Sequence, residues 1–218
     1  MRVLLLNYAS CGPLYCMRDT MRHHLSPLLI TIMLGCASAA HAELHYFTTS
    51  LNGAKEAPPN TSPGTGAATV TINDAANTMR LEVTFSGLVG TTSAAHIHCC
   101  TADPGAGTAG VATTVPSFSM FPLGVTSGTY DMTLDLLSAT TYNPAFITAA
   151  GGTLALAEAQ LLAGLAMGTS YFNIHTSVYP GGEIRGFLVA APIPEPGTLA
   201  MWVMGLAGLA GVRRWRNR

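Results

Sequence analysis

The 218-residue chain is poor in charge and in aromatic residues, which make up 10% and 7% of it. Its body, from Glu43 to Glu195, holds ten acidic residues but only Lys55, Arg80 and Arg185 as basic ones. The other basic residues lie near the two ends of the chain. An acidic body excludes a nucleic-acid-binding surface, because such surfaces need clustered lysine and arginine.

Several motifs that carry chemistry are also missing. The chain has no Gly-x-Ser-x-Gly elbow, no glycine-rich phosphate-binding loop and no Cys-x-x-Cys pair. Hydrolase, nucleotide-binding and thioredoxin-like interpretations therefore have no support. We predict no catalytic residues and no enzymatic activity.

The first 42 residues have the layout of a secretory signal. Met21–His24 is basic, Leu25–Leu34 is a short apolar run, and the small residues Ala40 and Ala42 stand at the positions that precede cleavage. This pattern predicts removal by signal peptidase after Ala42. The apolar run is too short for a transmembrane helix.

Residues 1–20 have no place in this signal. They are explained either by a true initiator at Met17 or Met21, or by an extended basic region. A lipoprotein signal at Cys36 is a weaker alternative, because Met33 and Leu34 depart from the residues preferred before the cysteine.

The C-terminal region, residues 191–218, has three parts in a fixed order. A short motif of Pro194, Glu195 and Pro196 precedes the apolar segment 198–212, and the chain ends in four arginines. As a helix the segment would be about 22 Å long, somewhat less than a ~30 Å hydrocarbon core. The arginines favour a cytoplasmic end. An ordinary single-pass anchor is one interpretation.

This order of motif, span and basic end closely resembles the PEP-CTERM tail of Gram-negative bacteria. The resemblance implies transient membrane insertion through the tail and processing by an exosortase. It also implies export through the periplasm and delivery to the cell surface or extracellular matrix.

The body, residues 43–190, alternates apolar and polar residues in short segments, which is typical of strands. The clearest is Thr78–Phe85, and a hairpin is expected in Tyr171–Leu188 around Pro180-Gly181-Gly182. Pro116–Gly128 is expected to be a loop with exposed aromatics. Further strands are expected at Leu44–Leu51, Ala68–Ile72, Ser93–His98, Val111–Val115 and Thr129–Leu136, and helical segments at Pro144–Ala149 and Leu154–Leu165.

These elements predict an all-β fold, an immunoglobulin-like or Greek-key β-sandwich with a short helical insertion. Five ordered motifs also resemble the CHRD domain over about residues 44–190: Asn52–Pro59, Thr84–Leu88, Ala95–His98, Asn173–Thr176 and Pro180–Gly186. The resemblance implies an all-β extracellular domain, and no activity is established for that class. This chain has Cys99-Cys100 where the family usually has glycine.

Three histidines form a candidate metal site. His96 and His98 share one face of a strand, and His175 lies on the outward face of another. Imidazoles in this arrangement, with Glu183 close by, suit copper or zinc. The alternative is a structural role, in which the rings hydrogen-bond to Glu183 or to the backbone.

The sequence leaves the roles of two further residue pairs undecided. In an oxidising compartment, Cys99 and Cys100 would form a vicinal disulfide, bridge to another chain or serve as auxiliary metal ligands. Glu183 and Arg185 share a strand face, where a structural network of ion pairs and hydrogen bonds is expected.

Together these features predict a secreted, surface-sorted binding or structural module within exopolysaccharide or biofilm. One alternative is a copper- or zinc-binding metalloprotein, redox-active or not, that uses His96, His98 and His175. Another is a protein-interaction domain that captures a secreted partner through its sheet edges or the loop Asn52–Gly66.

Overall fold

The computed structural model describes residues 43–192. The predicted signal cleavage at Ala40 and Ala42, the Pro194–Pro196 motif and the span 198–212 lie outside the described residues. Within residues 43–192 there are eight strands: β1 (Leu44–Asn52), β2 (Thr65–Asn73), β3 (Thr78–Ser86), β4 (Thr92–His98), β5 (Gly128–Asp135), β6 (Tyr171–Thr176), β7 (Ile184–Phe187) and β8 (Val189–Ala190).

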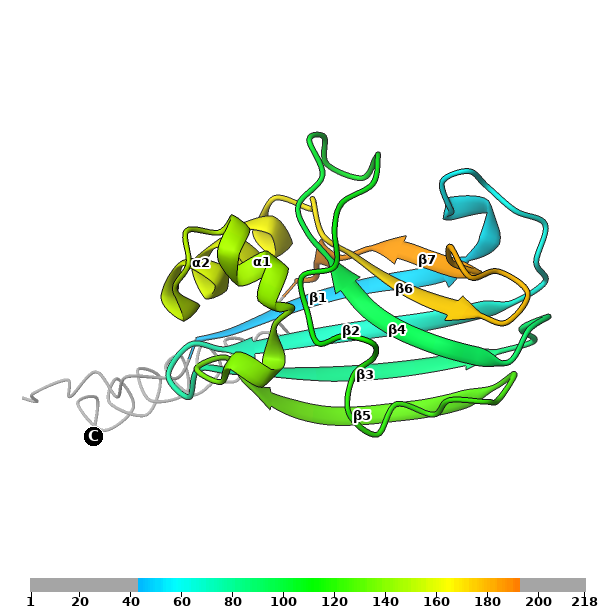
Figure 1. Ribbon diagram of the computed structural model, residues 1–218, viewed down its shortest axis with the longest axis horizontal. Coiled ribbons are helices and arrows are strands. Elements are labelled where there is room, and N and C mark those ends of the chain that lie inside the picture. The colour runs from blue at the N-terminus through cyan, green and yellow to red at the C-terminus, as the bar shows by residue number, and fades with distance from the viewer. Residues whose placement is uncertain (1–42, 193–218) are drawn as a thin grey trace, which may run out of the picture. The chain divides into compact units, whose positions relative to one another are not determined.

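The strands form one antiparallel sheet in the order β4-β6-β7-β1-β2-β3-β5, with β8 paired to β1 (Figure 1). Strands β1, β2 and β3 follow one another as a meander of nine-residue strands in full register. Strand β4, by contrast, pairs with β6, which is far from it in the sequence. This non-local pair carries the candidate histidines.

The sheet curls around one core, so that its two ends contact each other through aromatic rings. Phe121 stacks on Phe85 of β3, with ring centroids 5.6 Å apart, and packs against Phe172 of β6 at 6.4 Å. Phe118 stacks on Phe172 at 6.1 Å. The all-β prediction is confirmed: the halves of the curled sheet enclose the core as the layers of a sandwich do.

The helical insertion is confirmed as well. Helix α1 (Pro144–Ala149) has Asn143 as its N-cap, and α2 (Leu154–Ala166) has Thr153. Short 3₁₀ helices, η1 (Gly53–Lys55) and η2 (Ala139–Thr141), also occur. Helices α1 and α2 lie at one end of the sheet and η1 at the other (Figure 1). No helix within residues 43–192 is long and apolar enough to cross a membrane.

Two predictions for the connection between β4 and β5 are wrong. Val111–Val115 is not a strand: Ala112 N–H and Thr113 N–H both donate to the carbonyl of Ile97, and a regular ladder cannot form. The aromatics of 116–128 are not exposed, since Phe118 and Phe121 are 2% and 4% exposed. A loop that must close the core of a curled sheet needs large apolar side chains of its own.

We expect Phe121→Ala to lower the free energy of unfolding by about 3–5 kcal/mol, because it removes a ring that joins both ends of the sheet. Leu123→Ala in the same loop should change it by less than about 0.5 kcal/mol, because Leu123 is 49% exposed. Urea unfolding measures both. Equal, small effects would show that the loop does not close the core.

Candidate metal centre

The pairing of β4 with β6 places the three histidines on one face of the sheet. His96 lies opposite Asn173, and Ala94 lies opposite His175, one pleat further along. The residues between them in the sequence, such as Ile97 and Ile174, point into the core and are fully buried. One nitrogen from each of His96, His98 and His175 lies within 4.8 Å of the others.

Each histidine ring is held by a backbone carbonyl from a loop. Nε2 of His96 lies 2.6 Å from the carbonyl oxygen of Pro116, Nδ1 of His98 lies 2.9 Å from that of Ala109, and Nδ1 of His175 lies 2.9 Å from that of Pro180. A carbonyl oxygen can only accept, so each of these nitrogens carries the hydrogen. The tautomer of every ring is therefore fixed.

Within residues 43–192, the opposite nitrogen of each ring has no hydrogen-bond partner. These atoms are Nδ1 of His96, Nε2 of His98 and Nε2 of His175, and all three are buried. Burial lowers the pKa of His96 and of His98 to about 4 and also lowers that of His175. At neutral pH the three rings are uncharged, and each presents a free lone pair.

This arrangement has the chemistry of a metal centre. Neutral imidazole nitrogens are ligands for zinc and copper. The hydrogen bond at the far nitrogen is the feature that usually orients a ligating histidine, through a carbonyl or carboxylate. Three protein ligands would leave one tetrahedral position open.

Comparison with known proteins gives the family. Residues 47–188 match the CHRD domain. The chain belongs to the CHRD domain family. Residues 192–218 match the PEP-CTERM protein-sorting motif, so this CHRD protein is exported and sorted to the cell surface of a Gram-negative bacterium. No curated protein and no solved structure matches it.

Glu183 lies close to His175 in the strand pairing, because its N–H donates to the carbonyl of Ile174, but its carboxylate bonds elsewhere. It accepts hydrogen bonds from Ser62 Oγ at 2.5 Å, Thr176 Oγ1 at 2.6 Å, and the backbone N–H groups of Val89 and Gly90 at 2.6 and 3.1 Å. None of these bonds involves a histidine, and they form a hydrogen-bond network of the kind expected for Glu183 from the sequence. Its four donors explain why a carboxylate can be fully buried there.

Arg185 belongs to a separate network and not to that of Glu183. Its Nε donates to the carbonyl of Lys55 and lies 3.8 Å from Oε2 of Glu56. Burial raises the pKa of Glu56 to about 7, although Arg185 favours the charged form. The Arg185 guanidinium also lies 4.7 Å from the ring centroid of Tyr171, which stacks on His98 at 4.7 Å.

Sequence reasoning missed several groups that support the histidines. Tyr171 stacks on His98, and its hydroxyl also bonds to the backbone of Ala109, which holds the same ring. In the sequence, the only indication that Tyr171 and Asn173 lie on the face of the histidines was their alternation with the core residues of β6. The three carbonyl groups have no signal in sequence, because any residue can supply one.

Two further groups hold residue types that can bind a metal ion. The structure joins Cys99 and Cys100 in a disulfide. A second group, Glu43, His45 and Asp74, also brings ligand atoms within 4.8 Å, but it is largely exposed and His45 Nε2 is already bonded to Asp74 at 2.9 Å. This second group has the features of an ordinary surface ion pair.

The buried carboxylate of Glu183 predicts a pH dependence of stability. Burial opposes its charge, but the four hydrogen bonds outweigh burial and hold the pKa below its usual value near 4.5. A depressed folded-state pKa adds stability above the unfolded pKa, and this is lost as pH falls toward the folded value. We expect Glu183→Gln to cost about 2–4 kcal/mol at pH 7 and less below pH 4.

Urea unfolding of wild type and variant between pH 7 and pH 3 measures this difference. Asp103→Asn, at an exposed carboxylate, is the matched control and should cost less than about 0.5 kcal/mol throughout. A Glu183→Gln cost that stayed constant down to pH 3 would contradict the assignment.

Proposed function

We propose that this CHRD domain is a metalloprotein that binds one copper or zinc ion through Nδ1 of His96 and Nε2 of His98 and His175. The observation that carries the proposal has two parts: each of the three rings has a buried nitrogen with no hydrogen-bond partner among residues 43–192, and the rings bring one nitrogen each within 4.8 Å of the others. The metalloprotein thus becomes the leading function and the binding or structural module the second.

Energetics favour a ligand at this position. Leaving a buried polar atom without a partner costs about 1–3 kcal/mol, and three such atoms belong to rings whose centroids lie 5.1–5.9 Å apart. A metal ion satisfies all three at once and needs no proton to leave, because the lone pairs are already free. A purely structural role would account for the three bonded nitrogens but not for the three others.

The donor set narrows the choice of metal. Imidazole nitrogens suit zinc and copper, and a given nitrogen site normally binds divalent copper more tightly than zinc. An open fourth position is found in metal sites that exchange a ligand, whereas purely structural zinc sites are closed by four protein ligands. Copper at such a site would be able to change oxidation state.

Metal analysis of the exported protein should find about one copper or zinc ion per chain. The His96→Ala/His98→Ala variant should contain less than a tenth of that amount. Added metal should also raise the unfolding free energy of the metal-free wild type, by about 4 kcal/mol at a free concentration of a thousand times Kd. Plasma mass spectrometry and urea unfolding measure the two effects.

His45→Ala is the control, because it removes a histidine from the exposed second group and leaves the buried centre intact. Its metal content should equal that of the wild type. If His45→Ala loses the metal and the double variant keeps it, the metal binds at the exposed second group and not at the buried centre. Absence of metal from the wild type, with no stabilisation by added copper or zinc, would refute the proposal.

A groove favours the binding-module function as a second candidate. It has a volume of about 810 Å³ and lies beside β1, where Thr48, Thr49 and Ser50 offer hydroxyl groups and Phe187 an aromatic ring. Hydroxyl groups around an aromatic surface suit a saccharide of the surrounding matrix.

Phe187→Ala should reduce retention of the protein on purified matrix exopolysaccharide at least tenfold, whereas Val178→Ala, exposed and outside the groove, should not. Equal retention of both variants would exclude the groove.

A further inference from the structure

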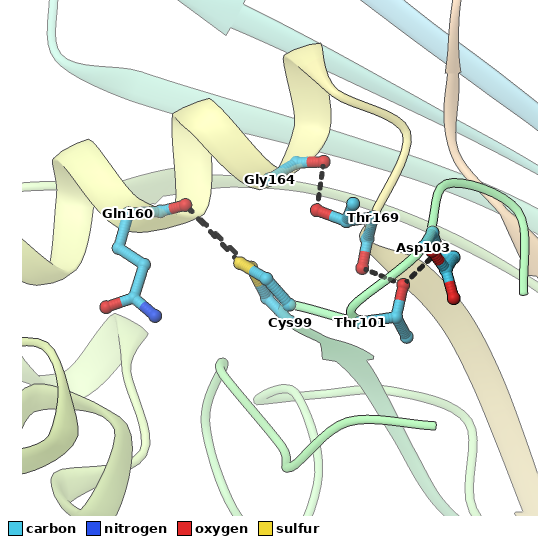
Figure 2. Close-up of a disulfide and its surroundings, with 7 residues drawn as sticks. Cys99, Thr101, Asp103, Gln160, Gly164 and Thr169 are labelled. Carbon is cyan, nitrogen blue, oxygen red and sulfur yellow. Dashed lines mark hydrogen bonds between the residues drawn. A yellow bond between two sulfur atoms is a disulfide. The ribbon is translucent and has the colours of Figure 1, made fainter. Parts of the chain in front are cut away.

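A disulfide follows directly after the ligand His98. Cys99, the next residue, is 5% exposed and is bonded to Cys100. The two sulfur atoms pack against helix α2, where they lie 3.8 and 3.6 Å from the carbonyl oxygen of Gln160 (Figure 2). They therefore sit on the helix and take no part in the metal centre.

The space that holds the two sulfurs is tight. Gly164 of α2 faces them, and a Cβ at this position would overlap both Sγ atoms and the hydroxyl oxygen of Ser170. Glycine is therefore required here by close approach, although it lowers helix propensity by about 1 kcal/mol relative to alanine. The helix surface is shaped to accept a bonded pair of sulfurs.

The segment 99–110 connects this disulfide to the metal centre. Thr101 N–H donates to the carbonyl of Thr169. Thr101 Oγ1 also donates to this carbonyl, and Thr169 Oγ1 donates to the carbonyl of Gly164, so the segment begins on the end of α2 (Figure 2). At its other end the carbonyl of Ala109 holds Nδ1 of His98. Both the chain position and the ring orientation of His98 thus depend on where this segment lies.

We propose that the oxidation state of Cys99 and Cys100 controls metal binding at His98, with tight binding only in the disulfide form. This inference rests on the proposed metal function. Bonded sulfurs are about 2.05 Å apart, whereas non-bonded heavy atoms need about 3.5–4.0 Å. Gly164 and Ser170 crowd the two sulfurs from the helix side, so we expect the separated thiols to shift the backbone of the buried Cys99, and His98 with it.

Reduction is a thiol–disulfide exchange with an external dithiol. Its thiolate attacks Sγ of Cys100, the less buried of the two residues, and forms a mixed disulfide while Cys99 leaves as a thiolate. The second thiol of the reagent then displaces Cys100. In total the pair gains two electrons and two protons, and the reagent becomes a disulfide.

Control by the disulfide would link metal binding to export. The protein is exported, and disulfides form outside the cytoplasm but are kept reduced within it. A chain still in the cytoplasm would then carry reduced cysteines and a displaced His98. It would acquire its metal only after export, when the disulfide has formed.

The test measures the Zn²⁺ affinity of the full exported protein, stripped of metal, by competition with a chromophoric chelator. Zinc is the probe because it has no redox chemistry of its own. The oxidised protein is compared with protein reduced by dithiothreitol and freed of reagent without air, with thiols counted in each. We expect reduction to expose two additional thiols and to weaken Zn²⁺ binding at least tenfold, and reoxidation to restore it.

Two variants separate the disulfide from general damage. Cys99→Ser/Cys100→Ser should bind Zn²⁺ as weakly as the reduced protein and should not respond to dithiothreitol. Gly164→Ala crowds the space under the helix without removing a sulfur, and it should also weaken binding. Circular dichroism shows whether each variant is folded, and the reduced wild type provides the test if a variant is not.

Equal Zn²⁺ affinity before and after the appearance of two thiols would overturn the proposal. A pair that dithiothreitol does not reduce in the folded protein would overturn it as well. If the oxidised protein itself binds neither Zn²⁺ nor copper, the proposed metal function fails first, and the disulfide has no site to control.

Discussion

The candidate metal centre depends on three backbone carbonyl groups, those of Ala109, Pro116 and Pro180, which accept hydrogen bonds from histidine rings. An imidazole has two nitrogens, and a carbonyl that takes the hydrogen of one leaves the other as a lone pair. Because burial keeps the rings uncharged, three lone pairs remain, in a cluster that brings one nitrogen of each ring within 4.8 Å of the others. The loops thus determine which nitrogen of each ring is free, and the strands determine where the three rings lie.

The three histidine rings are brought together by strand pairing within the curled sheet. Pairing β4 with β6 brings His96 and His98 beside His175, while the alternate side chains enter the aromatic core. The face with the histidines is covered in turn by loops, so it forms a second, polar buried layer and not a solvent-facing surface. In that layer Tyr171 stacks on His98 and on Arg185, and Glu183 anchors the neighbouring turn with four hydrogen bonds.

Local patterns predicted most of the fold. Alternation predicted β3 and the final hairpin, the two helical segments were expected close to where α1 and α2 lie, and the His-x-His spacing placed His96 and His98 on one face. The predictions that failed concern contacts between residues far apart in the sequence. Alternation cannot show that loop 116–128 must fill the open side of a curled sheet, so Phe118 and Phe121 were expected to be exposed. Nor can it show which strand pairs with β4, or that the Glu183 carboxylate finds four donors away from the histidines.

The central claim concerns which nitrogen of each ring binds metal, and nitrogen NMR of histidine-labelled, metal-free protein during a Zn²⁺ titration tests it most directly. The account predicts that His96 Nε2 and the Nδ1 atoms of His98 and His175 stay protonated throughout. It also predicts that His96 Nδ1 and the other two Nε2 atoms shift together, and that the shift is complete at one equivalent of zinc. Shifts confined to His45, shifts at the carbonyl-bound nitrogens, or none at all would contradict it.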